Sequence, residues 1–198
     1  GDEQPDLAEM TEVAIKMLQK NDGGYYLMVE AGRIDHGHHW GSAKAALFDT
    51  VALSKAVRKA MEMVDLDETM ILVTADHSHV FTMAGYPKRG NPIFGLVTGP
   101  HETEPTLAED GKPYTTLAYQ NGPGAVKGER KHLTEEDIAD PMFKPQALVP
   151  TRSETHGGED VALFAIGPWA HLVSGTMEQN VVFHIMDKAL NLRKRAAD

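Results

Sequence analysis

Histidine and carboxylate side chains gather in three short segments of this chain. Five of the ten histidines lie in two clusters, Glu30-Ala31-Gly32-Arg33-Ile34-Asp35-His36-Gly37-His38-His39 and Asp76-His77-Ser78-His79. A further histidine lies in the turn Thr155-His156-Gly157-Gly158-Glu159-Asp160. Aspartate and histidine together, in a chain without cysteine, suit a hard-to-borderline cation such as Zn²⁺ or Mg²⁺. The residue types therefore predict a metal site.

The spacing within the clusters supports this prediction. Asp35 and His39 are four residues apart, so one turn of helix would place both on one face. Asp76 and His77 are adjacent and could meet at a single ion only from an irregular turn. One histidine by itself is more simply a hydrogen-bonded core or surface residue, whereas three such clusters in one chain favour shared ligation.

The elements that would position these residues alternate along the chain. Apolar runs at residues 25–29 and 70–75 predict strands that end directly before the first two clusters, and residues 161–166 predict a third strand. Helical spacing predicts helices over residues 7–20, with Asp6 as N-cap, and 42–64. The capping box Thr176-Met177-Glu178-Gln179 would open a last helix. This order predicts an α/β fold, part of a mostly parallel central sheet flanked by helices, with the clusters at one edge.

The middle of the chain has a different character. Residues 86–150 hold nine of the eleven prolines and show no sustained period, although Val97 and residues 114–119 could form short strands. A structureless loop of this length is uncommon in a compact domain. We therefore expect an α/β core over residues 1–85, an inserted subdomain of short strands and turns over 86–150, and a return to the core over 151–198.

Bulk properties exclude several classes of protein. The net charge of -10 argues against a partner such as nucleic acid or an anionic membrane. Without cysteine there can be no disulfides or thiolate metal sites. No apolar run approaches the roughly 18 residues of a spanning helix, and the first residues do not form a signal peptide.

The motifs resemble the carboxy-terminal half of an animal-type alkaline phosphatase. The resemblance rests on the three clusters, with Val29 before the first, Thr74-Ala75 before the second and Glu154 before the third. Tyr86-Pro87-Lys88-Arg89-Gly90 and Gly167-Pro168-Trp169-Ala170-His171-Leu172 fit the same family. It covers almost the whole chain, in order, and motifs of this length are highly specific.

The resemblance implies two zinc ions and one magnesium ion around a phosphate pocket. By motif position, the first zinc would be held by Asp35, His39 and His156. The second would be held by Asp76 and His77, and the magnesium by Glu30. His36 would contact the metal site or the phosphate through water. His38 and His79 would not bind a metal ion but would pack behind the ligands or support them from outside. The reaction implied is hydrolysis of phosphate monoesters through a phosphoserine intermediate.

Several parts of the family pattern are missing from this sequence. None of its five serines follows an aspartate, so the Asp-Ser-Ala nucleophile motif is absent, as are the arginine that clamps phosphate and further metal ligands. We therefore expect a fragment, inactive alone, whose partner is the amino-terminal half of the enzyme. The family also implies an extracellular or cell-surface location, and a homodimer through the segment 86–150, called the crown, with Tyr86 reaching the neighbouring subunit.

Two other interpretations stay open. One is a relative that acts on phosphodiesters or sulfate esters, which the crown-like segment and the Asp35–His39 run disfavour. The other is a non-catalytic metal-binding or dimerisation module on the same scaffold. Whether the sequence upstream of this chain encodes Asp-Ser-Ala would distinguish the phosphatase, which needs that motif, from the non-catalytic module.

Overall fold

The computed structural model describes residues 4–196, which form two compact units. The first unit comprises the described parts of residues 1–29, 54–76 and 160–198. The second comprises residues 30–53 and 77–159, so the expected inserted segment, 86–150, lies wholly within it. Both units combine helices with strands, and the expected α/β class is confirmed.

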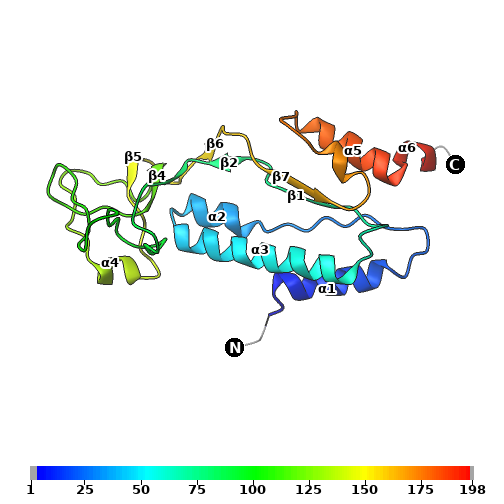
Figure 1. Ribbon diagram of the computed structural model, residues 1–198, viewed down its shortest axis with the longest axis horizontal. Helices are drawn as coiled ribbons and strands as arrows, with labels where there is room; N and C mark the ends of the chain where they lie inside the picture. The colour runs from blue at the N-terminus through cyan, green and yellow to red at the C-terminus, as the bar shows by residue number, and fades with distance from the viewer. Residues whose placement is uncertain (1–3, 197–198) are drawn as a thin grey trace. The chain divides into compact units, whose positions relative to one another are not determined.

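Two helices form where the sequence predicts them, one in the first unit and one across both units. Helix α1 (Leu7–Leu18) begins with a capping box, in which the Asp6 side chain accepts from the Glu9 N–H and the Glu9 side chain accepts from the Asp6 N–H. Helix α3 (Ala43–Met63) is shared by the two units. Its carboxy-terminal half runs beside α1 (Figure 1), where Lys59 Nζ lies 3.3 Å from Glu12 Oε2.

The strands of the first unit pair in an unexpected direction. Strand β1 (Ile71–Thr74) pairs with β7 (Leu163–Ile166), as the two apolar runs predict, but the pairing is antiparallel, with Ile71 opposite Ile166 and Thr74 opposite Leu163. The only parallel pair among the described strands lies in the second unit. An apolar run specifies a buried strand and not the direction of its partner, so the mostly parallel pairing expected is absent from residues 4–196.

Two predictions of local structure in the first unit are wrong. Residues 25–29 form no strand, and the side chains of Tyr26 and Met28 are 59% and 66% exposed. Their backbone is not paired with another strand in the described residues, and a strand needs such a partner. After the 3₁₀ turn η1 (Ala170–Leu172), helix α5 (Asn180–Leu190) has Gln179 as N-cap without a side-chain cap, so the capping box expected at Thr176 does not form. The short helix α6 (Leu192–Arg195) follows.

The second unit opens with a short helix packed closely on a longer one. Helix α2 (Arg33–His39) lies beside the amino-terminal half of α3 (Figure 1), and Gly37 makes the contact. A Cβ atom at Gly37 would lie 2.7 Å from the backbone nitrogen of Ala46, too close for any side chain. Glycine therefore permits the approach that fixes α2 against α3.

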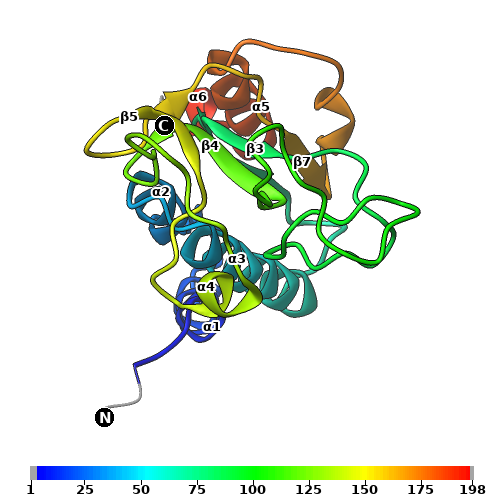
Figure 2. The ribbon, with the colours of Figure 1, turned by 90° about the vertical axis from the view of Figure 1, so that its left-hand side faces the viewer.

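Two small sheets complete the second unit. Strand β4 (Leu117–Gly122) pairs antiparallel with β3 (Phe81–Met83) and parallel with β5 (Ala147–Pro150), and Figure 2 shows β3 and β4 side by side. The strand expected over residues 114–119 is thus shifted toward the carboxyl end, and the one expected at Val97 is only an isolated bridge between Leu96 and Thr115. Strands β2 (Ser78–His79) and β6 (His156–Gly157) form a separate antiparallel pair.

Two apolar clusters hold this unit together. The first packs Ala43 of α3 against Leu117 and Tyr119 of β4. The second contains Leu96, Leu133 and Ile138, the last from helix α4 (Glu135–Ala139). Lys44 joins α3 to the end of α4, because its ammonium group donates to the carbonyl oxygens of Ile138, Ala139 and Asp140 at 2.8, 3.0 and 3.3 Å.

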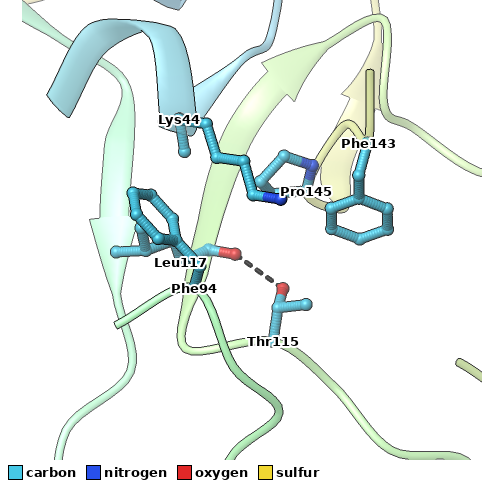
Figure 3. Close-up of a pocket in the computed structure, with 7 residues that line it drawn as sticks. Lys44, Phe94, Thr115, Leu117, Phe143 and Pro145 are labelled. Atoms are coloured by element: carbon cyan, nitrogen blue, oxygen red, sulfur yellow. Dashed lines mark hydrogen bonds between the residues drawn. The ribbon is translucent and has the colours of Figure 1, made fainter. Parts of the chain in front are cut away.

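Two cavities of the second unit are lined by residues other than the clustered histidines. Lys44 borders a cavity of about 10 Å³ together with Phe94, Thr115, Leu117, Phe143 and Pro145 (Figure 3). This volume is near the minimum for one water molecule and excludes a substrate. A wider pocket of about 670 Å³ lies within residues 88–135. In the described part of the chain, no helix combines the length and the apolar character needed to cross a bilayer.

Candidate metal centre

Three segments of the second unit meet at one group of side chains. Antiparallel pairing of β2 with β6 places His79 opposite His156. Helix α2 contributes Asp35 and His39, which lie one turn apart as their spacing predicts. Helix α2 and strands β2 and β6 thus converge, although they are far apart in the sequence.

Asp35, His39 and His156 have the spacing of ligands around one ion. Each offers an atom within 4.8 Å of the others. The Nε2 atoms of His39 and His156 are 3.1 Å apart, and they lie 3.2 and 3.5 Å from Asp35 Oδ1. Ligands about 2.0–2.1 Å from a tetrahedral zinc ion are separated by about 3.3 Å. The three positions therefore fit a zinc ion with further coordination positions left over.

Asp35 Oδ1 provides a second sign of a cation. This oxygen is buried and has no hydrogen-bond partner within the described residues. Nε2 atoms of His39, His79 and His156 lie 3.2, 3.1 and 3.5 Å away, within the range of an ion pair, but not in hydrogen-bonding directions. Lone pairs on nitrogen and oxygen repel one another, so a cation bound among them would account for the convergence. An oxygen and nitrogen donor set of this kind suits zinc.

A hydrogen bond at Nδ1 of His39 determines that its other ring nitrogen, Nε2, is the one available to bind a metal ion. His39 Nδ1 lies 2.7 Å from the carbonyl oxygen of Glu154, which can only accept. Nδ1 must therefore carry a proton, and in the neutral ring Nε2 keeps its lone pair. Metal-binding histidines are usually oriented in this way.

A buried layer of aromatic side chains lies behind the ligands. His38 is 9% exposed, stacks on His79 at 4.5 Å between ring centroids, and pairs through Nδ1 with the Tyr119 hydroxyl at 3.0 Å. Burial, reinforced by the charge of His79, lowers the pKa of His38 to about 4, so the ring is neutral at pH 7. Burial also raises the pKa of Tyr119. These neutral groups pack under the ligands, and the Nδ1 atom of His38 is engaged by the Tyr119 hydroxyl, outside the cluster of Asp35, His39 and His156.

The other predicted ligands are less closely grouped. His77 forms a second cluster with Asp35 and His79, and its ring stacks on that of His156 at 3.7 Å between centroids. Asp76 follows β1 in the first unit and is exposed. Glu30 is also exposed, and the three clusters found in residues 4–196 include neither of these two acids. Their ligand roles stay predictions.

Two further sequence-predicted residues are on the surface of the second unit. His36 is exposed on α2, with its ring 6.1 Å from that of Trp40. Tyr86 is 92% exposed and has a left-handed backbone conformation, with φ of 63°. Within residues 4–196, His36 is in none of the three clusters of possible metal ligands.

Sequence reasoning gave Glu154 no role, although it forms the third cluster with His39 and His79. The residue is 1% exposed, and its carboxylate accepts from His79 Nδ1 at 2.8 Å and from the Val80 N–H at 2.9 Å. Its position two residues before the predicted ligand His156 was a signal in the sequence, whereas its contacts to His39 and His79 were not.

Comparison with known proteins identifies the family. The family model of alkaline phosphatase matches residues 1–192. This chain belongs to the alkaline phosphatase family. The resemblance predicted from the motifs is therefore confirmed, and membership of this family of phosphatase hydrolases implies metal cofactors.

Curated alkaline phosphatases are similar to this chain over most of its length. It is 53% identical over 184 residues to the tissue-nonspecific alkaline phosphatase of Gallus gallus and 51% identical over 184 residues to that of Felis catus. It is 49% identical over 184 residues to the alkaline phosphatase of Gadus morhua. These matches cover 92% of this chain but only 34%, 34% and 37% of the relatives, so the chain spans about a third of their length.

A solved alkaline phosphatase shares the fold. The structure of a TAB5 alkaline phosphatase variant with Mg bound in its M3 site aligns with a TM-score of 0.58 at 21% identity. The alignment covers 93% of this chain and 41% of that protein. Almost all of this chain therefore follows one part of an alkaline phosphatase fold.

Proposed function

We propose that this chain supplies metal ligands to an alkaline phosphatase that hydrolyses phosphate monoesters. The convergence of Asp35, His39 and His156 on one position carries the proposal. The buried Asp35 Oδ1, which lacks a hydrogen-bond partner in the described residues, supports a cation at that position. Family membership supplies the class of reaction.

The three residues of this cluster would hold the first zinc ion. Asp76 and His77 would hold a second zinc ion, and Glu30 a magnesium ion, with His36 acting through the second shell. Ions in such a set stabilise the negative charge on the entering and leaving oxygens during an in-line displacement at phosphorus. The residues of this chain would keep the ligand atoms fixed: His39 holds its proton on Nδ1, which leaves Nε2 directed at the cluster.

The serine that attacks phosphate is proposed to lie outside this chain. None of Ser42, Ser54, Ser78, Ser153 and Ser174 follows an aspartate, as the family's nucleophile does. The phosphoserine intermediate would then form on a residue of the remaining part of the protein. The isolated 198 residues are accordingly expected to be inactive.

We further propose that the complete protein is an extracellular or cell-surface homodimer that contacts its second subunit through residues 86–150. The exposure of Tyr86, 92%, supports a role for this side chain in that contact. Its backbone conformation, rare for a residue with a side chain, would hold the ring outward.

A chimera would test the activity directly. The chain replaces the matching segment of the Gallus gallus enzyme, to which it is 53% identical, and hydrolysis of p-nitrophenyl phosphate is measured before and after chelation. We expect activity that is lost with chelator and restored by zinc and magnesium. The same chimera carrying His156→Ala is the matched control and should stay inactive after metal is restored.

Other substrates in the same assay test the alternatives. Faster hydrolysis of bis(p-nitrophenyl) phosphate or p-nitrophenyl sulfate than of the monoester would contradict the monoesterase. A folded, metal-loaded chimera that hydrolyses none of the three would instead support a non-catalytic module.

A further inference from the structure

We propose that Glu154 is a positioning residue that fixes two segments of the metal centre against each other. This inference rests on the proposed zinc site and assigns the group that orients it. Glu154 is 1% exposed, and among the buried polar side chains of residues 4–196 it is the one acidic residue. A buried carboxylate is costly unless hydrogen bonds compensate for the lost water, so its contacts define its role.

The backbone of Glu154 is bonded to His39 in both directions. His39 Nδ1 donates to the Glu154 carbonyl oxygen at 2.7 Å, and the Glu154 N–H donates to the His39 carbonyl oxygen at 3.1 Å. The two residues are 115 positions apart in the sequence. This pair of bonds therefore sets the position of α2 relative to the segment that carries His156.

The carboxylate of Glu154 extends the same constraint to His79. Its Oε2 accepts from His79 Nδ1 at 2.8 Å, and its Oε1 accepts from the Val80 N–H at 2.9 Å. The opposite nitrogen of His79, Nε2, lies 3.1 Å from Asp35 Oδ1. Glu154 thus orients His39 through its carbonyl group, and it orients the ring that lies against Asp35 through its carboxylate.

A glutamine at this position would keep the shape and lose one acceptor. The amide has a single oxygen, so either the Val80 N–H or the Nδ1–H of His79 would face an NH₂ group. The backbone bonds to His39 would be unchanged. Outer-shell partners of this kind are typically worth about 10–100-fold in metal affinity, and we expect a loss of zinc affinity in that range for Glu154→Gln.

The experiment uses the 198-residue chain and two measurements. Zinc affinity is determined by competition with a chelator for the wild type, Glu154→Gln and the control Tyr119→Phe. The control removes the hydroxyl that pairs with His38, one layer behind the ligands, and should change affinity less than about twofold. ¹⁵N NMR of the metal-free chain then identifies which ring nitrogen of each histidine carries the proton.

We expect the tautomer to change at His79 and not at His39, a difference that a general loss of stability would not produce. In the wild type, His39 and His79 should both carry their proton on Nδ1. In Glu154→Gln, His79 should become a mixture of tautomers, while His39 stays protonated on Nδ1 because its carbonyl acceptor remains. Folding is followed by the helical circular dichroism signal.

Three results would overturn the proposal. One is zinc affinity of Glu154→Gln within about twofold of the wild type. Another is weakened affinity with an unchanged His79 tautomer. The third is a wild-type His79 without a proton on Nδ1. This last measurement uses the wild-type chain alone, so it does not depend on whether a variant folds. Failure of the zinc site itself is distinguishable, because His156→Ala would then leave zinc binding intact whatever Glu154→Gln does.

Discussion

His39 and Glu154 are joined by two hydrogen bonds of opposite direction, at 2.7 and 3.1 Å, across 115 residues of sequence. Through them a helix at the start of the second unit is held to a segment near its end. The geometry of the centre therefore depends on contacts between segments distant in sequence, as well as on the ligands themselves.

Removal of one ligand tests the cluster. His156→Ala leaves Asp35 and His39 as two donors, and we expect zinc binding to weaken by more than the roughly 10–100-fold that loss of an outer-shell partner costs. Elemental analysis of the dialysed chain gives the zinc stoichiometry. His132→Ala, at an exposed histidine outside the clusters, should retain the ion. Equal stoichiometry in both variants would show that His156 is not a ligand.

The contact between α2 and α3 predicts the effect of a methyl group. In Gly37→Ala the new Cβ would meet the backbone nitrogen of Ala46 at 2.7 Å, so α2 must shift. We expect a loss of about 1–3 kcal/mol in the free energy of unfolding and weaker zinc binding. Gly85→Ala is the control, because a Cβ there meets nothing within 4 Å. Urea unfolding measures both, and a Gly37→Ala chain as stable as the control would contradict the close packing.

Arg130 and Asp110 predict a dependence of stability on pH. Two guanidinium nitrogens of Arg130 lie 2.7 and 2.5 Å from the two carboxylate oxygens of Asp110, and this hydrogen bonding lowers the pKa of Asp110 below 3.8. A carboxyl group whose pKa is lowered by folding adds stability above its ordinary pKa, and that stability disappears as the pH falls through the lowered value.

Arg130→Lys tests this ion pair, because a lysine cannot make the bidentate contact with both carboxylate oxygens of Asp110. Its urea midpoint should lie below that of the wild type at neutral pH, and the difference should shrink once the pH falls below about 4, the ordinary aspartate pKa. Arg152→Lys, at an exposed arginine, should match the wild type throughout. A difference that is the same at both pH values would show that Asp110 is not the partner that matters.

Tyr86 separates a role in assembly from a role in folding. Because its side chain is 92% exposed, Tyr86→Ala should change the unfolding free energy of this chain by less than about 0.5 kcal/mol. In the chimeric enzyme the same change should weaken dimerisation, measured by sedimentation velocity at several concentrations. Met142→Ala, at a side chain 78% exposed, serves as control. A dimer equally stable in both variants would exclude Tyr86 from the subunit contact.

Several local patterns in the sequence predicted local structure correctly, although the capping box expected at Thr176 did not form. The spacing of Asp35 and His39 requires only one helical turn, which α2 supplies, and the capping of α1 by Asp6 involves residues three positions apart. The apolar runs of β1 and β7 were also sufficient to identify two strands. Each of these predictions depends on neighbours in the chain.

Predictions that needed a distant partner were less successful. The apolar run at residues 25–29 has the composition of a strand, yet Met28 is 66% exposed and no strand pairs with this segment in the described residues. The direction of β7 relative to β1 cannot be read from either segment. Glu154 was missed because the residue that makes it structurally significant, His39, is 115 positions away.

The distance in sequence between the ligands also imposes an order in time. His39 and His156 are 117 residues apart, and a ribosome adds about 5–20 residues per second, so His156 is made roughly 6–23 s after His39. During that interval the nascent chain carries Asp35 and His39 but not yet His156, the third residue of the cluster. Stable capture of an ion by this cluster must therefore wait until most of the chain has been synthesised.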